Sequence, residues 1–387
     1  MAEAVLRTTK LVLLANTDWY LANFRFELAS ALKEAGAEVH CIAPPGKYLD
    51  WLEEQGFSTH ALKMGDESYS PLDNARTLKH LKALYREIQP DLAHHFTPRC
   101  VVLGSMAARK TGVKHVINAL TGLGHVFTSN SLKSRLARPV LRSVLNRNLN
   151  GESRAVIFQN SDDMNELVDA GVVSRDRCHL IRGSGVNPDK FCPVPEGRED
   201  SEIRILFASR LIAEKGIHEL VESMREVVAT HPGAVLWVAG EPYAQNPTSL
   251  TDQDLNNLEQ LPFVRLLGHV DDIAPVLSQV DIVALPSYRE GTPKILLEAA
   301  ACALPIVATD IAGCRGVVEH EKSGYLVPVR DVSQITVALN ALCGDSALRV
   351  SMGLRGREII EKGFTSEMVN RNTLDVYRVL LGGGILE

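Results

Sequence analysis

Residues 282–302 read IVALPSYREGTPKILLEAAAC, an apolar run followed by a turn and then by a helical pattern. The run Ile282–Ser287 predicts a buried strand, because near-continuous apolar residues are typical of a parallel strand covered on both faces. Thr292 is a good helix N-cap and Pro293 suits the first helical position, so a helix is predicted over Lys294–Cys302. A strand that leads through a short turn into a helix is the repeating unit of an α/β fold.

The same unit recurs on both sides of this stretch. In the first half, strands are predicted at Leu11–Ala15, Val39–Ala43, Thr59–Met64, Leu92–Phe96, His115–Leu120, Val156–Asn160 and His179–Arg182. In the second half, further strands are predicted at Ile205–Ser209, Val235–Gly240, Val264–Gly268, Ile306–Asp310 and Tyr325–Pro328. Two such arrays, each alternating with helical patterns, imply two doubly wound α/β domains.

The join between the two arrays is predicted at Ile181–Pro195, where glycines and prolines cluster. We therefore expect a first domain over residues 1–180 and a second over residues 181–363. A final helix within residues 364–387 is expected to pack back on the first domain. The length of 387 residues agrees with two domains, since a typical domain has about 100–200 residues.

The composition narrows the class of protein. With 45% hydrophobic residues the chain is not disordered, and a formal net charge of −6 argues against a general nucleic-acid-binding protein. The charge is distributed unevenly, because residues 92–151 contain nine Lys or Arg and no Asp or Glu. This asymmetry predicts an anionic partner for one part of the chain.

Cysteine use and apolar runs bear on location. The seven cysteines are scattered and form no C-x-x-C, so neither a disulfide framework nor a zinc site is expected. The apolar run Leu11–Ala15 is far shorter than a membrane span, which needs about 18 residues. The pair Asp252 and Asp254 lies in a polar turn before a predicted helix, which indicates surface residues rather than a metal site. We expect a cytoplasmic protein that reaches a membrane only from its surface.

The start of the helix after Ile282–Ser287 is a candidate phosphate site. Free backbone N–H groups around residues 292–295 would lie at the carboxyl end of a parallel strand, where anions bind. Glu290 lies outside this helix and Glu298 about one and a half turns inside it, so the two carboxylates are expected to face different parts of a ligand. Beside a phosphate, a carboxylate suits hydroxyl groups. The alternative is a capped surface helix with incidental acids.

Two cations are predicted at the same edge. Arg210 and Lys215 follow the strand Ile205–Ser209 and can neutralise a diphosphate, Arg as a directed fork and Lys as a mobile point charge. The alternative is a solvated basic pair beside Glu214.

Two further loops reach this edge. Glu241 follows one predicted strand, and His269 and Val270 follow another. Each loop can line a nucleotide base and ribose.

Four segments, Ala208–Gly216, Gly268–Asp272, Ser287–Ala301 and Val307–Gly313, closely resemble glycosyltransferase family 4. These are retaining enzymes of the GT-B fold, in which two Rossmann-like domains face each other across a cleft. The resemblance covers almost the whole chain. It implies a nucleotide-sugar donor, most often a UDP-sugar, and no metal or other cofactor.

The resemblance also implies roles for the candidate donor residues. Arg210 and Lys215 would bind the donor diphosphate and support its departure, and Gly291 and Thr292 would offer backbone amides. Glu290 would contact hydroxyls of the donor sugar, and Glu298 those of the ribose. Such sequences often carry Glu where this chain has Gly316, and Glu319 is too displaced to be assumed a replacement.

The acceptor is expected at two loops of the first half, Asn16–Arg25 and Thr121–Thr128. The candidate contacts are Asn16, Asn23, Arg25, Thr121, Gly122, Gly124 and His125. His125 is also a candidate catalytic residue, although His94, His95 and His115 show that histidines also occupy ordinary positions in this chain. Asn23–Arg25, Thr121–Ser129 and Ile181–Val186 resemble transferases that extend undecaprenyl-diphosphate-linked sugars, which implies a lipid-linked sugar acceptor.

Residues 131–150 form a basic amphipathic stretch, predicted as two short helical pieces divided by Pro139. Its basic residues are Lys133, Arg135, Arg138, Arg142 and Arg147. Such a segment can lie on anionic lipid, with about 1 kcal/mol per basic residue near the surface. The alternatives are a helix packed on the first sheet and, less well supported because aromatics are missing, a nucleic-acid groove.

The expected reaction is a retaining, metal-independent transfer of a hexose or N-acetylhexosamine from a nucleotide sugar to a lipid-linked or glycan acceptor. It would take place at the inner face of a bacterial membrane during polysaccharide or glycan assembly. Two alternatives remain at this point, a sugar-nucleotide epimerase of the same fold and a non-catalytic nucleotide-sugar-binding protein.

Overall fold

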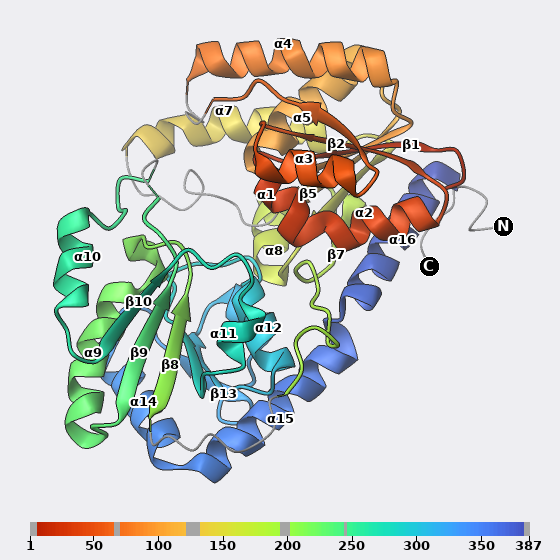
Figure 1. The fold of residues 1–387 in the computed structure, drawn as a ribbon. Coiled ribbons are helices and arrows are strands. Elements are labelled where there is room, and N and C mark those ends of the chain that lie inside the picture. Colours follow the sequence, from red (N-terminus) through yellow and green to blue (C-terminus); the bar gives the residue numbers. More distant parts are fainter. Residues whose placement is uncertain (1–5, 66–69, 121–131, 194–201, 244–245, 383–387) are drawn as a thin grey trace. The chain divides into compact units, whose positions relative to one another are not determined.

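The computed structural model describes residues 6–65, 70–120, 132–193, 202–243 and 246–382, and for residues 132–140 only the backbone is described. The chain divides into two compact units (Figure 1). The first comprises Met1–Ser184 with Val369–Glu387, and the second comprises Gly185–Met368. The boundary between them lies within the predicted join Ile181–Pro195.

Seven parallel strands of the described residues form the sheet of the first unit, in the spatial order β3-β2-β1-β4-β5-β6-β7. They are β1 (Lys10–Leu14), β2 (Glu38–Ala43), β3 (Ser58–Ala61), β4 (Leu92–Phe96), β5 (His115–Leu120), β6 (Arg154–Phe158) and β7 (Cys178–Leu180). The helices are α1 (Asp18–Tyr20), α2 (Phe26–Glu34), α3 (Lys47–Glu54), α4 (Pro71–Ile88), α5 (Pro98–Thr111), α7 (Leu132–Leu149), α8 (Ser161–Asp169) and α16 (Ser366–Gly382), with the π-helical turn η1 (Leu21–Arg25) and the 3₁₀ turn η2 (Arg175–Arg177).

The predicted strands of this half are confirmed, with limits that differ by up to three residues. Strand β6 lies two residues earlier than predicted, because Asn160 does not continue the strand. Its side chain instead accepts a hydrogen bond from the Asp163 backbone N–H at 2.8 Å and caps helix α8.

Strand β1 shows how the first sheet is buried on both faces. Leu11 and Leu13 belong to an apolar cluster with residues of α2 and α16, whereas Val12 and Leu14 pack in a second cluster with α4 and α5. Alternate residues of a strand point to opposite faces, so an uninterrupted apolar run is what a doubly covered sheet requires. Helix α16 closes one face of this sheet: the Tyr377 hydroxyl lies 2.6 Å from His94 Nδ1 of β4, and both side chains are buried.

Helix α7 corrects one prediction. Pro139 does not divide this stretch, because the backbone forms a single helix over Leu132–Leu149. A proline inside a helix removes one backbone hydrogen bond and costs about 3 kcal/mol. The last turns of α7 offset this cost, because Leu145 and Leu149 are buried in an apolar cluster with Val101 of α5.

Six parallel strands of the described residues form the sheet of the second unit, in the order β10-β9-β8-β11-β12-β13. They are β8 (Ile203–Ala208), β9 (Ala234–Ala239), β10 (Val264–Gly268), β11 (Ile282–Leu285), β12 (Ile306–Thr309) and β13 (Gly324–Val327). The helices are the 3₁₀ turn η3 (Ala213–Lys215), α9 (Ile217–Thr230), α10 (Asp252–Glu259), α11 (Ala274–Leu277), α12 (Lys294–Ala301), α13 (Ala312–Arg315), α14 (Val332–Gly344) and α15 (Ser346–Gly363). The predicted strands of this half are confirmed.

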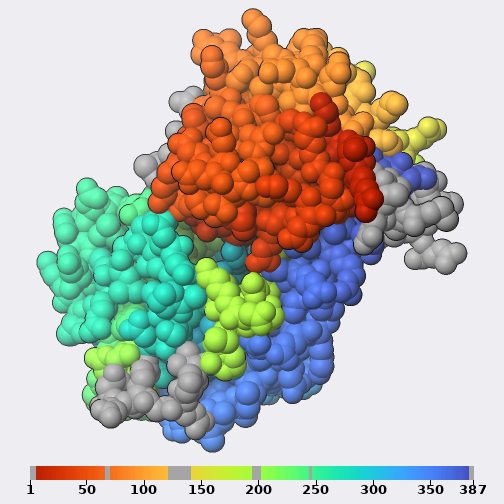
Figure 2. Space-filling view, turned by 45° about the vertical axis from the view of Figure 1, so that its right-hand side comes forward, coloured from red at the N-terminus to blue at the C-terminus, as the bar shows by residue number. Residues whose placement is uncertain are grey.

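Helices cover both faces of the second sheet (Figure 1). On one face α9 packs on α14, where the Ser223 hydroxyl donates to the Val332 carbonyl at 3.0 Å. On the other face α15 packs on α12, and Arg357 donates to the Ala301 carbonyl at 2.6 Å. Arg357 also donates to the Phe191 carbonyl at 2.7 Å. This bond holds the segment after Gly185, yellow-green in Figure 2, on the surface beside the blue C-terminal helices.

Two further features bear on the expected class of protein. The seven cysteines, all in the described part of the chain, form no disulfide. Among the helices that the structure describes, none combines the length and apolar character needed to cross a membrane.

Candidate active site

The order of strands reverses between β8 and β11 in the second sheet. Loops that leave neighbouring strands in opposite directions form a crevice at such a switch point, and open α/β sheets bind ligands there. Arg210 and Lys215 follow β8, and Glu290 follows β11. The topology therefore places these three predicted residues at the same edge of one sheet.

Gly216 lets the two loops approach each other. Its φ is +75°, a conformation that favours glycine, and a Cβ at this position would overlap the Pro286 carbonyl oxygen. The Glu214 carbonyl then accepts hydrogen bonds from the Tyr288 N–H at 2.8 Å and from the Ser287 hydroxyl at 3.2 Å. These contacts fix the loop after β8 to the loop after β11.

Lys215 and Glu290 form an ion pair across this junction, with the ammonium group against Glu290 Oε1. Their side chains are only 14% and 13% exposed. The pair is therefore largely shielded from water, where the attraction between charges is stronger than at an open surface. A cation and a carboxylate thus lie side by side where the sequence predicted a diphosphate and sugar hydroxyls.

The turn that carries Glu290 packs against Gly313 of helix α13. A Cβ on Gly313 would lie 2.6 Å from the Glu290 carbonyl oxygen and would overlap that of Gly291. Only a residue without a side chain fits at this position. The backbone at Glu290 and Gly291 is therefore positioned by packing as well as by its own sequence.

Helix α12 spans Lys294–Ala301, close to the predicted Lys294–Cys302, but its cap lies one residue later than predicted. Pro293, with extended backbone angles, occupies the cap position, and Thr292 makes no capping bond. The predicted roles of Thr292 as N-cap and Pro293 as first helical residue are therefore wrong. The cause is the buried Pro293, whose carbonyl accepts from the Leu296 N–H at 3.1 Å and so closes the first turn. The helix still starts at the carboxyl end of β11, so its first N–H groups remain suited to an anion.

Glu298 lies inside α12 and is 6% exposed. Burial raises the pKa of its carboxyl group, and the nearby Lys294 opposes this shift. The Lys294 ammonium group lies 3.6 Å from Glu298 Oε1. Because Glu290 pairs with Lys215 instead, the two carboxylates have different partners. A buried carboxylate with a single loose ion pair is suited to accept hydrogen bonds from hydroxyl groups.

Arg210 is exposed, and its guanidinium group lies 5.0 Å from the centre of the Tyr243 ring. Stacking of this kind orients the guanidinium while leaving its N–H groups available to a ligand. Tyr243 was not predicted, because only the folded loop after β9 brings it to Arg210.

The loops after β9 and β10 reach the same edge of the sheet. Gly240 lies against β8, where a Cβ would overlap the Ser209 carbonyl oxygen, and its N–H donates to the Gly268 carbonyl at 2.7 Å. Glu241 and His269 are exposed, and Val270 packs against the apolar core. The structure therefore brings these predicted residues to the edge that carries Lys215 and Glu290.

Glu319 does not take the place of the acid expected at Gly316. Both of its carboxylate oxygens accept hydrogen bonds from Arg355 of α15, at 2.8 and 2.9 Å. Asp254 is also occupied, because it forms a capping box with Thr251 at the start of α10. Among the described residues no group of three or more His, Cys, Asp or Glu side chains could hold a metal ion.

In the first unit the candidate acceptor loop follows β1. Asn16 is exposed, and the Asn23 side chain donates to the Trp19 carbonyl at 3.0 Å within the helical turns. Arg25 is only 7% exposed, with its guanidinium 4.5 Å from the centre of the Phe96 ring. Nη2 of Arg25 also donates to the Tyr20 hydroxyl at 2.9 Å. Arg25 therefore supports this loop from beneath.

Trp19 is a candidate contact that sequence reasoning missed. It is 41% exposed in the loop after β1 and packs edge-on against Phe24 at 5.3 Å. Asp18 fixes this loop, because its carboxylate accepts from the backbone N–H groups of Trp19 and Tyr48, both at 2.8 Å. The signal available in the sequence was the aromatic residue itself, next to a polar turn at the end of a strand.

The remaining predicted residues are only partly covered by the structure. Thr121, Gly122, Gly124 and His125 lie outside the described residues, as do the side chains of Lys133, Arg135 and Arg138. Arg142 and Arg147 are exposed on α7.

Comparisons with known proteins agree with this geometry. Residues 202–345 match the family model "Glycosyl transferases group 1", and residues 10–160 match "Glycosyl transferase 4-like". The chain is 24% identical over 341 residues to the N,N'-diacetylbacillosaminyl-diphospho-undecaprenol alpha-1,3-N-acetylgalactosaminyltransferase of Campylobacter jejuni, covering 85% of this chain and 88% of the relative. It is 25% identical over 359 residues to the UDP-Gal:alpha-D-GlcNAc-diphosphoundecaprenol alpha-1,3-galactosyltransferase of Escherichia coli, covering 89% and 87%.

A solved structure shares the fold. The Anabaena protein HepE, determined in complex with UDP and glucose, superposes with a TM-score of 0.76 at 16% identity, over 96% of this chain and 99% of HepE. Both family models describe glycosyl transferases, so the chain is a glycosyltransferase, and its two parallel sheets have the GT-B fold. The chain belongs to glycosyltransferase family 4.

Proposed function

We propose that this enzyme transfers a hexose or an N-acetylhexosamine from a UDP-sugar to a lipid-linked diphosphate-sugar acceptor, with retention of configuration. The observation that carries the proposal is the shielded Lys215–Glu290 pair beside the start of α12. A nucleotide sugar offers the complementary groups, a diphosphate for the ammonium group and sugar hydroxyls for the carboxylate. Binding of the donor would replace one shielded ion pair by two charge-assisted contacts.

In the proposed reaction the bond between the anomeric carbon and the diphosphate oxygen breaks, and the acceptor hydroxyl oxygen bonds to that carbon from the same face. The proton of the hydroxyl passes to the departing diphosphate. Arg210 and Lys215 compensate the negative charge that develops there, and the amides of Gly291 and Thr292 add donors. Glu290 orients the sugar and Glu298 the ribose. Because two cations stabilise the leaving group, we expect no metal requirement.

The relatives support the choice of substrates. The name of the E. coli relative specifies a UDP-sugar donor and a diphosphoundecaprenol-linked acceptor, and that of the C. jejuni relative specifies a diphospho-undecaprenol acceptor. HepE was solved with UDP and glucose. The acceptor would contact Asn16, Asn23 and Trp19 of the loop after β1, which the buried Arg25 supports, and residues 121–125. The reaction would serve the assembly of a bacterial polysaccharide or glycan.

A lipid-linked acceptor requires the enzyme to work at the inner face of the cell membrane. The exposed Arg142 and Arg147 of α7, with Lys133, Arg135 and Arg138 in the same helix, would attract anionic lipid. Flotation with vesicles that contain phosphatidylglycerol tests this. The R135Q/R138Q/R142Q variant is expected to float less than the wild type, and equal flotation would contradict a role for α7.

The reaction is tested by incubating the purified enzyme with EDTA, a panel of radiolabelled UDP-sugars and a short-chain polyprenyl-diphosphate-sugar. We expect label to enter the lipid fraction for one donor of the panel. Isomerisation of a UDP-sugar in the absence of acceptor would instead identify an epimerase. Binding of UDP-sugars with no turnover of any kind would indicate a binding protein.

A further inference from the structure

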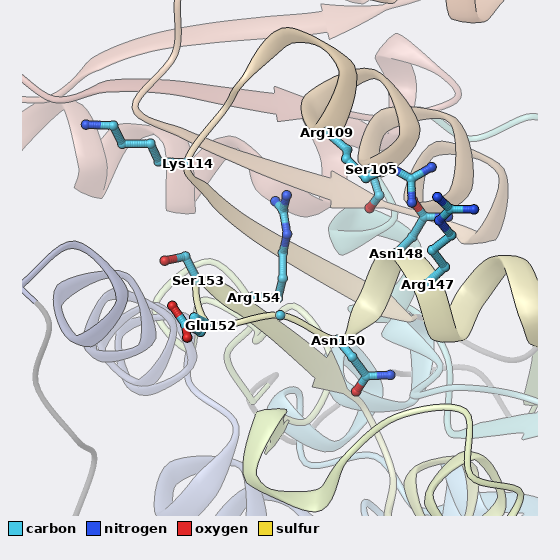
Figure 3. A pocket seen from close by; sticks show the side chains of 10 residues that line it. Ser105, Arg109, Lys114, Arg147, Asn148, Asn150, Glu152, Ser153 and Arg154 are labelled. Carbon is cyan, nitrogen blue, oxygen red and sulfur yellow. The ribbon is translucent and has the colours of Figure 1, made fainter.

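A basic pocket lies at the opposite edge of the first sheet from the loop after β1. It has a volume of about 250 Å³ and is lined by residues of α5, α7 and the segments that lead into β5 and β6 (Figure 3). Lys114 directly precedes β5, and Arg154 is the first residue of β6. Because all strands of this sheet are parallel, the pocket is at their amino ends. The six residues of β5 span about 17 Å between the pocket and the carboxyl end of that strand.

Four cations line this pocket. Arg109 extends from the end of α5, Arg147 from the end of α7, Lys114 from the loop before β5, and Arg154 from β6. In Figure 3 the Arg154 side chain rises from its strand into the space between Lys114 and the group formed by Arg109 and Arg147. Among the described residues none of the four forms an ion pair with a carboxylate. The pocket includes one acid, the exposed Glu152, whose side chain points away from Arg154 in Figure 3.

Arg154 is the cation of this cluster with a buried hydrogen-bond donor that lacks a partner in the described part of the chain. Its Nη1 atom is buried and has no hydrogen-bond partner among the described residues. Burial, followed by repulsion from Arg109, lowers the pKa of its guanidinium group. A buried donor without a partner costs stability, and like charges held together add to that cost. An anion in the pocket would offset the repulsion between Arg154 and Arg109.

The helix dipole explains the positions of only two of the four cations. Arg109 and Arg147 each lie in the last turn of a helix, where the helix dipole favours a cation. Arg154 begins a strand, and Lys114 lies in a loop, so the dipole does not account for them. Three arginines from three separate elements therefore line one small pocket, and Lys114 lies at its margin with its ammonium group directed away from Arg154 (Figure 3).

We propose that this pocket binds a phosphate group, with Arg154 at its base and Arg109, Arg147 and Lys114 around its rim. Guanidinium groups match phosphate oxygens as paired donors, and the volume fits a small phosphorylated molecule or a lipid headgroup rather than a nucleotide sugar. The site is separate from the donor residues, which belong to the second unit. It does not depend on the proposed reaction.

The test compares the double variant R109Q/R147Q with the control R86Q/K110Q. All four residues are exposed, both variants lose two positive charges, and Arg86 and Lys110 lie outside the pocket on α4 and α5. In one arm, thermal unfolding is followed while inorganic phosphate replaces chloride at constant ionic strength. In the other arm, flotation measures binding to phosphatidylcholine vesicles that contain either phosphatidic acid or phosphatidylglycerol at equal surface charge, because Arg147 also belongs to the α7 surface proposed to attract any anionic lipid.

For a soluble phosphate, the wild type and the control are expected to gain thermal stability as phosphate is added. R109Q/R147Q should bind phosphate about tenfold more weakly or worse. For a lipid headgroup, the selective loss appears only in flotation with phosphatidic acid, again in R109Q/R147Q and not in the control. If the two variants behave alike in both arms, the proposal is overturned.

Discussion

The Lys215 ammonium group pairs with the Glu290 carboxylate across the switch point of the second sheet, although 75 residues separate them in sequence. Neither residue lies in a regular strand or a long helix. Each residue lies in a loop, and hydrogen bonds from Ser287 and Tyr288 to the Glu214 carbonyl fix the two loops to each other. The proposed donor site is therefore a property of two loops fixed together, and changes to the fixing contacts should affect activity as well as stability.

Gly313 provides the first test of this coupling. In G313A the new methyl group would clash with the carbonyl groups of Glu290 and Gly291. We expect kcat/KM to fall at least tenfold and the free energy of unfolding to fall by about 1–3 kcal/mol. G363A is the control, because a Cβ at Gly363 meets no atom within 4 Å. Kinetics and denaturant unfolding measure both effects, and an unaltered G313A would show that the turn is not held by this packing.

Glu298 is expected to act on donor affinity. E298Q should raise the KM for the UDP-sugar about 10–100-fold with a smaller change in kcat, because a hydrogen bond to a charged acceptor is replaced by a neutral one. The exposed Glu259 supplies the control E259Q. A fall in kcat with an unchanged KM would contradict the assignment to the ribose.

The raised pKa of Glu298 has consequences for pH. This pKa lies above the ordinary value of 4.5. As pH falls toward it, the carboxylate becomes protonated, and the donor affinity of the wild type should weaken. E298Q should lack this pH dependence. Because the folded state holds the proton more tightly than the unfolded state, the ionised carboxylate lowers stability at higher pH. E298Q is therefore expected to unfold at pH 8 no earlier than the wild type, which thermal unfolding checks.

His95 predicts acid sensitivity of the first unit. Its side chain is fully buried, and burial lowers its pKa to about 3, although the bond to Asn118 opposes this. Because the unfolded histidine titrates near 6.5, the stability contributed by the neutral folded form is lost as pH falls from 6.5 toward 3. The loss amounts to about 1.4 kcal/mol per pH unit for one site.

H95Q should therefore show a shallower decline of the unfolding free energy between pH 6.5 and 4.5 than the wild type. H218Q, at an exposed histidine of α9, is the control and should keep the wild-type slope. Denaturant unfolding at several pH values measures the slopes. An unchanged slope in H95Q would mean that His95 is not the neutral buried group described.

Trp19 tests the acceptor side of the proposed reaction. W19A should raise the KM for the lipid-linked acceptor about tenfold, since an exposed aromatic ring beside the loop after β1 can stack on a sugar. The KM for the UDP-sugar should not change. L72A removes a still more exposed apolar side chain of the same unit and is the control. Equal effects of W19A on both substrates would contradict an acceptor role.

Much of the fold followed from the sequence, because strands buried on both faces must be apolar at nearly every position. Leu11–Leu14 and Ile282–Leu285 were recognisable for that reason. The helix limits at Thr292 and Pro139 were predicted wrongly, because intrinsic preferences compete there with burial. Pro293 is buried, and the end of α7 is anchored by Leu145 and Leu149.

The candidate site was predictable as a set of residues but not as a set of contacts. Arg210, Lys215, Glu290 and Glu298 could be named from their spacing and from the resemblance to a family. The Lys215–Glu290 pair, the stacking of Arg210 on Tyr243 and the burial of Arg25 depend on loops far apart in sequence. No local pattern encodes such contacts.

The most direct measurement is the kcat of K215A for transfer from the UDP-sugar to the polyprenyl-diphosphate-sugar acceptor. Loss of a cation at the leaving diphosphate should lower kcat about 10²–10³-fold, by analogy with removal of one transition-state hydrogen-bond donor. The exposed Lys322 supplies the control K322A, which should transfer at the wild-type rate. A K215A enzyme that folds and transfers sugar as fast as the wild type would contradict the account.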